Sequence, residues 1–244
     1  MKSLTDGEFV EIQAFVDRTL AYLEQPDLCL TVEVDPDLHG WKRHMLSVGT
    51  EVAATHDPDL NNLDATNSFW VKLVSQTGDV VGCGVYRVLV TENIAFEAVT
   101  HRLFGDRAPV LRHYPLDVCV DREVNDIRGR VGLGGGIWAH GDFRGRGLGG
   151  IISRFLRILS VRWFNTDWHV GFVQLTEKAE RLGLGVYGFP HATVFIRGAH
   201  PGYGGDDHDT VLVWFRRDEI LAQLIAENEA DSTVGREGET RRIA

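Results

Sequence analysis

The chain has 244 residues, of which 43% are hydrophobic and 25% are charged, a composition typical of a globular protein with a sizeable core. The formal net charge of −10 argues against a general nucleic-acid binder. No run of about 18 apolar residues is present, so the sequence predicts neither a membrane-spanning helix nor a membrane partner.

The N-terminal residues and the cysteines indicate a cytoplasmic protein. Asp6, Glu8 and Glu11 interrupt any apolar stretch of the kind that a signal peptide needs. The three cysteines lie far apart in the sequence and lack metal-ligand spacing. We therefore interpret them as reduced core residues, and we expect no metal site.

Hydrophobic periodicity and capping signals predict a succession of helices and strands. The first helix begins at a capping box, Thr5 to Glu8, and is closed by Pro26. A turn at residues 76–79 joins two strand-like segments into the clearest hairpin, in which Gly82 and Gly84 are candidate bulge positions. Helices are expected at residues 5–26, 38–54, 91–104, 148–164, 176–184 and 217–229. Strands are expected at residues 28–34, 68–75, 80–90, 116–120, 132–140, 169–174, 192–197 and 210–215.

The domain organisation follows from the same pass along the chain. The sequence shows no internal repeat and no linker, so we expect one domain that spans residues 1–230. Residues 231–244 have little apolar surface to bury, which predicts a disordered tail.

A cationic, glycine-rich turn lies between an expected strand and an expected helix. Backbone N–H groups at a helix start lack partners within the helix, and the helix dipole adds partial positive charge there. Glycines let a phosphate approach the backbone closely, and arginines supply charge and forked donors. The segment from Val120 to Asn165 holds eight arginines and four acidic residues, a local net charge of +4 (8 − 4) in an acidic chain. We therefore predict an anion site formed by Arg144, Gly145, Arg146, Gly147, Leu148, Gly149 and Gly150.

The same turn satisfies the dinucleotide pattern G-x-G-x-x-G, but a second match that starts at Gly183 shows how weak this pattern is alone. A dinucleotide-binding unit needs an acidic residue at the end of the following strand, where this chain carries Gln174. The Walker pattern G-x-x-x-x-G-K-[ST] is absent, which disfavours a P-loop nucleotide hydrolase. A dinucleotide-dependent oxidoreductase stays open as an alternative function.

The spacing Arg144-x-x-Gly147-x-Gly149 resembles the Q/R-x-x-G-x-G/A pyrophosphate signature of the GCN5-related N-acetyltransferase (GNAT) superfamily. That family places the signature after its fourth strand, at the start of a long central helix. A strand, a short helix, the pair Gly188-Phe189 and two closing strands then follow here in the family's order. The resemblance covers residues 132–197, and the hairpin at residues 68–90 is compatible with the family's second and third strands.

The resemblance implies an α/β fold in which helices flank a mixed, mostly antiparallel central sheet. It also implies an acyl-CoA N-acyltransferase, with acetyl-CoA or another acyl-CoA as co-substrate and a small-molecule or peptide amine as acceptor. The N–H groups of residues 145–150 would then hold the coenzyme A pyrophosphate. Trp138 and Ala139 would pair through their backbones with the pantetheine arm, in a slot where the family's fourth and fifth strands splay apart. A backbone N–H would polarise the thioester.

The groups expected to move protons depart from the family pattern. Many members carry a Glu or His base on the fourth strand, where this chain has glycines at residues 132, 134 and 135. Many members carry a tyrosine acid at the position of Leu184, so we expect the nearby Tyr187 to act as general acid. His140, at the end of the strand, is a candidate base.

Other features leave further alternatives open. Gln174 is a candidate for lining the acceptor pocket, whereas His169 is interpreted as a satisfied core histidine. Residues 91–130 separate two strands that the family joins by a short turn, which predicts an insertion beside the acyl slot. Because no base is evident on the fourth strand, a non-catalytic acyl-CoA-binding sensor stays open, and so does a homodimer.

Overall fold

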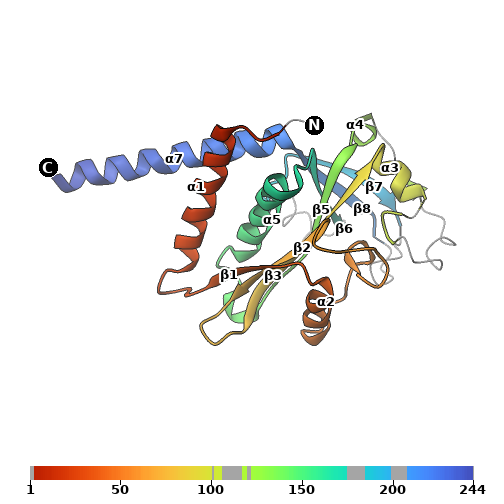
Figure 1. The fold of residues 1–244 in the computed structure, drawn as a ribbon, viewed down its shortest axis with the longest axis horizontal. Coiled ribbons are helices and arrows are strands. Elements are labelled where there is room, and N and C mark those ends of the chain that lie inside the picture. Colours follow the sequence, from red (N-terminus) through yellow and green to blue (C-terminus); the bar gives the residue numbers. More distant parts are fainter. Residues whose placement is uncertain are drawn as a thin grey trace.

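A single mixed sheet organises the molecule. The computed structural model describes residues 3–100, 102–105, 117–119, 122–174, 185–198 and 208–243, with the backbone alone for residues 231–243. Within these ranges eight strands form one sheet in the order β1-β2-β3-β5-β6-β8-β7-β4 (Figure 1). Neighbouring strands are antiparallel except β5 and β6, which run parallel, so the expected mixed, mostly antiparallel sheet is confirmed. The strands are β1 (Thr31–Asp35), β2 (Ser68–Val74), β3 (Val80–Thr91), β4 (Asp117–Val118), β5 (Gly129–Ala139), β6 (Trp168–Gln174), β7 (His191–Arg197) and β8 (Thr210–Arg216).

Helices cover both faces of this sheet (Figure 1). One face packs against α1, α5 and the inner part of α7, through apolar side chains such as Phe15, Phe155 and Leu224. The opposite face packs against α2, the 3-10 turn η1, α3 and α4, through side chains such as Trp41 and Ile94. The helices are α1 (Asp6–Leu23), α2 (Leu38–Ser47), η1 (Ala54–His56), α3 (Ile94–Val99), α4 (Arg122–Asn125), η3 (Gly141–Phe143), α5 (Leu148–Phe164) and α7 (Arg217–Ile243).

The start of α1 is the capping box that the sequence predicts. The Glu8 N–H donates to the Thr5 hydroxyl at 3.2 Å, and the Thr5 N–H donates to the Glu8 carboxylate at 2.6 Å. Two donors that a helix start leaves without partners are thereby satisfied. The helix then buries Ile12, Phe15 and Leu23 against the sheet.

Two helices are shorter than we expected. The helix expected over residues 38–54 ends at Ser47, just before Gly49 takes a left-handed φ of +70° that an α-helix does not accommodate. The helix expected over residues 91–104 is confined to α3, which begins at Ile94 because the Asn93 side chain caps it by accepting hydrogen bonds from the N–H groups of Ala95 and Phe96. The helix expected over residues 176–184 lies outside the described residues.

The expected insertion and the expected tail both contain regular secondary structure. Residues 91–130 contribute α3, β4 and α4, and β4 lies at the edge of the sheet beside β7. The last helix, expected to end at Glu229, continues to Ile243, so the backbone of residues 231–243 is helical where we expected disorder. The domain boundary near residue 230 stays a prediction. No helix in the described part of the chain is both long and apolar enough to span a bilayer.

Candidate functional site

The two parallel strands in the middle of the sheet separate along their length. Residues 131–133 of β5 pair with residues 168–170 of β6. In the part of the chain that the structure describes, no backbone pairing joins these strands beyond Leu133 and Val170. Both strands nevertheless continue, β5 to Ala139 and β6 to Gln174, while β5 stays paired with β3 on its other edge. The splay that we expected between these strands is therefore present and opens a slot in the sheet.

A cavity of about 420 Å³ occupies this slot on the face covered by α5. Most of its lining is apolar, which suits the burial of an uncharged, extended ligand segment. Its floor is formed by glycines from both strands, so backbone groups of the two strands border the space directly. The lining residues are Gly134, Gly135, Gly136, Ile137, Ser153, Leu156, His169, Gly171, Phe172, Val173, Gln174, Tyr187, Phe189 and Val213.

On the α5 face, side chains from neighbouring strands occupy the room above the β5 glycines. A Cβ atom built on Gly132 would lie 1.8 Å from the Tyr86 hydroxyl oxygen, and one on Gly134 would lie 2.8 Å from His169 Cε1. Distances below 3.0 Å exclude any side chain at these positions unless Tyr86 or His169 moves. The glycines that replace the expected strand base thus make room for a tyrosine and a histidine.

On the opposite face, two other rings lie against the next pair of glycines. A Cβ atom on Gly135 would lie 2.9 Å from His56 Cε1, and one on Gly136 would lie 2.5 Å from Trp41 Cζ2. Gly136 also takes a φ of +55°, and the β3–β5 register shifts beside it, so β5 carries a bulge there. A bulge redirects backbone groups out of the ladder and is frequent beside active sites. This bulge lies where β5 borders the cavity.

The predicted turn leads from the end of β5 into α5 as the sequence indicates. Gly147 is the N-cap of α5 and has a φ of +76°, and Gly145 has a φ of +80°. The Ile151 N–H donates to the Gly147 carbonyl at 3.2 Å, so the N–H groups of the preceding helical residues have no partner within the helix. No atom lies within 4 Å of a Cβ built on either glycine, so the turn is open to solvent. A side chain at Gly147 would be strained by this φ even with open space around it.

The two arginines of the turn hold it to other parts of the chain. Arg144 Nε donates to the Ala139 carbonyl at 3.4 Å, and Arg146 Nη1 donates to the Asp27 carbonyl at 2.7 Å. The Arg146 guanidinium also lies 5.5 Å from the centre of the Phe143 ring. Both side chains remain exposed, so their positive charge stays at the start of α5 where an anion would be held.

Trp138 and Ala139 lie at the end of β5, opposite Cys83 and Gly82 of β3. Their other edge faces the slot, beyond the last pair that joins β5 to β6. The Trp138 ring packs edge-on against His44 of α2, with centroids 5.1 Å apart, and so points away from α5. The backbone of Trp138 and Ala139 thus borders the mouth of the slot, and its pairing with an extended ligand stays a prediction.

Of the two predicted proton-transfer residues, the structure brings Tyr187 to the cavity and leaves His140 outside its lining. Tyr187 Cε1 is 3.4 Å from a Cβ built on Gly149, so this ring lies between the turn and the slot. Burial raises the pKa of Tyr187, which keeps its hydroxyl protonated. His140 is exposed and accepts a hydrogen bond from the Asp142 N–H at 3.4 Å, capping η3. Gln174, expected in the acceptor pocket, lines the cavity.

His169 also lines the cavity, and we did not predict this position from the sequence. It is buried and hydrogen-bonded as we expected of a core histidine, with Nδ1 3.0 Å from the Tyr86 hydroxyl oxygen. It nevertheless lines the cavity together with Gly171 and Val173, which share its face of β6. The alternation of β6 and the glycines of β5 could have indicated this position, since residues 169, 171 and 173 must share one face of a strand.

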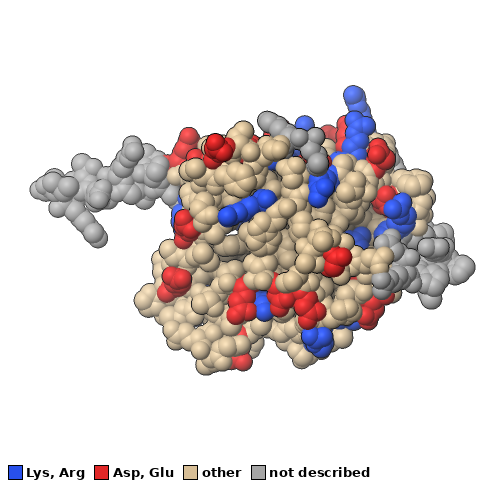
Figure 2. Space-filling view, viewed as in Figure 1, with Lys and Arg blue, Asp and Glu red and all other residues tan. Residues whose placement is uncertain are grey.

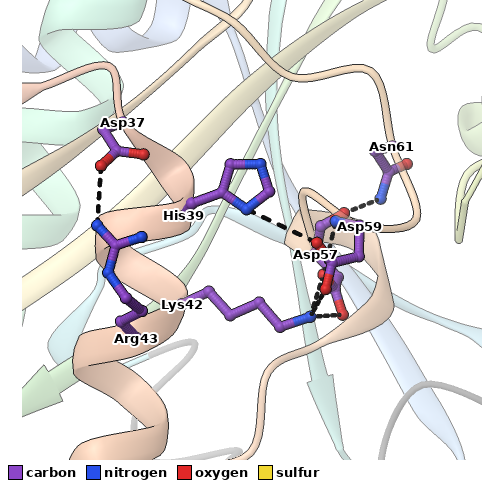
Figure 3. Close-up of polar contacts among 7 residues, drawn as sticks. All are labelled: Asp37, His39, Lys42, Arg43, Asp57, Asp59 and Asn61. Atoms are coloured by element: carbon purple, nitrogen blue, oxygen red, sulfur yellow. Dashed lines mark hydrogen bonds and ion pairs between the residues drawn. The ribbon is translucent and has the colours of Figure 1, made fainter.

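A charged cluster on the opposite face fastens η1, which carries His56, to α2 (Figure 3). Lys42 Nζ of α2 donates to Asp57 at 2.6 Å and to Asp59 at 2.7 Å. The Asn61 amide donates to the Ala54 carbonyl at 2.7 Å. Lys72 of β2 likewise pairs with Glu33 and Asp35 of β1, at 2.8 Å and 3.1 Å. Figure 2 shows acidic side chains gathered around a basic one on the surface near β1 and α2.

We expect Lys42→Met to lower the free energy of unfolding by about 1–2 kcal/mol, because it leaves the Asp57 carboxylate without its charged donor. The side chains of Lys42 and Asp57 are only 20% and 14% exposed, so solvent does not fully replace this pair. Arg43→Met on the same helix is the matched control, since Arg43 is 72% exposed and should change stability by less than about 0.5 kcal/mol. Urea denaturation followed by tryptophan fluorescence measures both, and equal losses would contradict the assignment.

The chain is similar to solved acyltransferase structures at low sequence identity. No family model matches the chain, and no curated protein sequence matches it. Among solved structures it is similar to Arabidopsis thaliana NAA60 in complex with acetyl-CoA, at 12% identity over 76% of this chain and 99% of that chain, with a TM-score of 0.46. It is also similar to ribosomal-protein-S5-alanine acetyltransferase from Vibrio fischeri, at 13% identity over 89% and 92%, with a TM-score of 0.39. The CoA-dependent acyl-homoserine lactone synthase BjaI, with SAM and isopentyl-CoA, is similar at 12% identity over 92% and 83%, with a TM-score of 0.40.

With TM-scores below 0.5, these three similarities by themselves decide neither family nor function. The features of the chain itself are more specific. β5 is followed by the glycine turn and the long helix α5, and β6 runs parallel to β5 and splays from it. Two closing antiparallel strands then complete the order that the signature at Arg144 predicts. The chain therefore has a GNAT-like fold.

Proposed function

We propose that the chain is an acyl-CoA-dependent N-acyltransferase that transfers an acetyl group to the amine of a small molecule or a peptide. The observation that carries this proposal is the adjacency of the glycine turn and the cavity. A Cβ built on Gly149 would lie 3.4 Å from Tyr187 and 3.7 Å from Ile137, and both of these residues line the cavity. An anion site therefore opens directly into an apolar slot, which matches a ligand with a pyrophosphate followed by an extended, uncharged arm.

Each part of an acyl-CoA has a counterpart in this proposal. The N–H groups of residues 145–150 hold the pyrophosphate, with Arg144 and Arg146 adding positive charge. The pantetheine arm carries amide groups, which pair with the edge of β5 at Trp138 and Ala139 in the way that a neighbouring strand would. The splay between β5 and β6 supports this placement, because it leaves that edge without a strand partner in the described residues.

The reaction we propose is direct attack of the amine on the thioester carbonyl. The thioester lies beside the bulge at Gly136, where a backbone N–H stabilises the negative charge that develops on the carbonyl oxygen. Tyr187 donates a proton to the departing thiolate, since burial keeps its hydroxyl protonated. We also propose a cytoplasmic location, which the free thiols of Cys29, Cys83 and Cys119 support.

One alternative keeps support from a specific observation. The described lining of the cavity contains no carboxylate, so an acyl-CoA-binding sensor without transfer activity is the second candidate. The dinucleotide-dependent oxidoreductase loses support, because its motif belongs to repeated parallel βαβ units and the sheet here is mostly antiparallel.

Calorimetry with acetyl-CoA and with NAD, followed by a thiol-release assay with a panel of primary amines and short peptides, tests the proposal. We expect acetyl-CoA to bind, NAD to give no heat of binding, and at least one amine to cause release of free coenzyme A. Binding of acetyl-CoA without thiol release from any amine would favour the sensor. Binding of NAD without any response to acetyl-CoA would overturn the proposed function.

A further inference from the structure

The described lining of the cavity holds two ionisable side chains, His169 and Tyr187. Burial raises the pKa of Tyr187, so this residue is suited to donate a proton rather than to accept one. Acyl transfer to an amine also needs a group that takes a proton from the attacking nitrogen. Within this lining, His169 is the one side chain with a basic nitrogen.

The His169 ring lies at the closed end of the slot, where β5 and β6 are still paired. His169 pairs with Gly132 of β5 in the parallel ladder. The ring is stacked between Tyr86 and Phe189, with centroid distances of 5.3 Å and 5.4 Å and interplanar angles of 16° and 13°. Its Cε1 and Nε2 atoms lie 2.8 Å and 3.4 Å from a Cβ built on Gly134. The imidazole edge thus takes the place that a side chain of β5 would otherwise fill.

One tautomer of His169 suits a role in proton transfer. Its Nδ1 atom lies 3.0 Å from the Tyr86 hydroxyl oxygen, which accepts a hydrogen bond when Nδ1 carries the ring proton. This arrangement leaves Nε2 without a proton on the edge of the ring that faces Gly134 and the slot.

We propose that Nε2 of His169 accepts the proton that the acceptor amine loses as it attacks the thioester. This inference rests on the proposed function. The amine nitrogen bonds to the carbonyl carbon, and its surplus proton moves to Nε2. The carbon–sulfur bond breaks, the electron pair leaves with sulfur, and Tyr187 protonates the thiolate. The imidazolium returns its proton to Tyr187 through solvent, so both residues end in their starting states and the products are the amide and free coenzyme A.

The groups around the ring keep it neutral before the reaction. The Arg157 guanidinium of α5 acts on it electrostatically, the Tyr86 hydroxyl of β3 contacts it, and Tyr187 lines the same cavity. Burial and the Arg157 guanidinium hold the pKa of His169 well below its usual range. The ring is therefore neutral at physiological pH with its lone pair available, and it holds a proton only while the attacking nitrogen supplies one.

The test replaces His169 by alanine and adds imidazole. We expect His169→Ala to keep its affinity for acetyl-CoA within about threefold and to lose about 100-fold in kcat with the best amine of the panel. Added imidazole should restore part of kcat in proportion to its neutral form, because the cavity left by the ring admits it. His191→Ala is the control: His191 also stacks on an aromatic ring, Trp214, at 5.3 Å, but does not line the cavity.

Each result separates this inference from the proposed function. If the wild-type protein binds acetyl-CoA and releases thiol while His169→Ala keeps its kcat, His169 is not the base although the function stands. If the wild-type protein shows neither binding nor thiol release, the proposed function itself fails. Should His169→Ala not fold, NMR of isotope-labelled histidine in the wild-type protein decides. A proton on Nδ1 alone is expected at neutral pH, and a proton on Nε2 would overturn the proposal.

Discussion

Gly149→Glu is expected to weaken acetyl-CoA binding by about tenfold or more while the protein stays folded. A Cβ at this position would point toward Tyr187 and Ile137, so the added carboxylate would lie at the junction of the turn and the slot. There it repels a pyrophosphate and obstructs the arm that follows it. The helix itself tolerates the change, because an acidic side chain in the first turn interacts favourably with the helix dipole. Calorimetry with acetyl-CoA measures the loss of affinity.

Two matched variants control for charge and for space. Gly149→Ala adds only a methyl group, whose nearest neighbour is 3.4 Å away, an ordinary contact. It should leave the affinity within about threefold. Gly7→Glu adds the same charge to the first turn of α1, where no atom lies within 4 Å of the new Cβ. If Gly149→Glu binds acetyl-CoA as well as these two variants do, the turn does not hold the pyrophosphate.

Gly132→Ala is expected to lower the free energy of unfolding by about 3 kcal/mol or more. The added methyl group would lie 1.8 Å from the Tyr86 hydroxyl oxygen and 2.4 Å from its Cζ atom. Tyr86 is fully buried, stacked on Phe69 and His169, so it has no room to move aside. Thermal and urea denaturation of the purified variant measure the loss.

The double variant Gly132→Ala/Tyr86→Ala isolates this clash. Tyr86→Ala alone loses a buried aromatic ring and should cost about 3–5 kcal/mol. With the ring removed, the three atoms nearest to the methyl group at residue 132 are gone, so the second substitution should add little. Strict additivity of the two losses would show that the glycine is needed for another reason, such as its backbone conformation.

Local sequence signals predict most strands and the glycine turn, because these features depend on neighbouring residues. The alternation of the hairpin, the capping box at Thr5 and the order of elements from β5 to β8 are all of this kind. We predicted the splay of β5 from β6 from the resemblance to a family, because no local sequence pattern indicates where two parallel strands separate. The predicted end of α2 was wrong. The apolar periodicity continues beyond Ser47, but Gly49 adopts a left-handed φ that an α-helix does not accommodate.

The glycines of β5 show the limit of such reasoning. In the sequence they indicate a missing base, and nothing near them says what replaces it. The structure places four rings against them, those of Trp41, His56, Tyr86 and His169, which come from α2, η1, β3 and β6. Contacts between residues this far apart in the chain depend on tertiary packing, so a single sequence does not reveal them. The role of His169 therefore stays a proposal that only the assembled sheet suggests.

The glycine-rich segment of β5 has a consequence for how binding and folding are linked. This part of the strand has almost no side chains, so residues of four neighbouring elements form the walls of the slot. These walls exist only once the four elements have packed against β5. A partly unfolded chain consequently has no slot to offer, and acyl-CoA should bind the native state alone. Saturating ligand at 100 times its Kd would then add about 2.7 kcal/mol to stability. A rise in the thermal midpoint would then report binding of a ligand in the slot. Melting temperatures measured with acyl-CoAs of different chain lengths would rank how well each acyl group fits, before any acceptor amine is known.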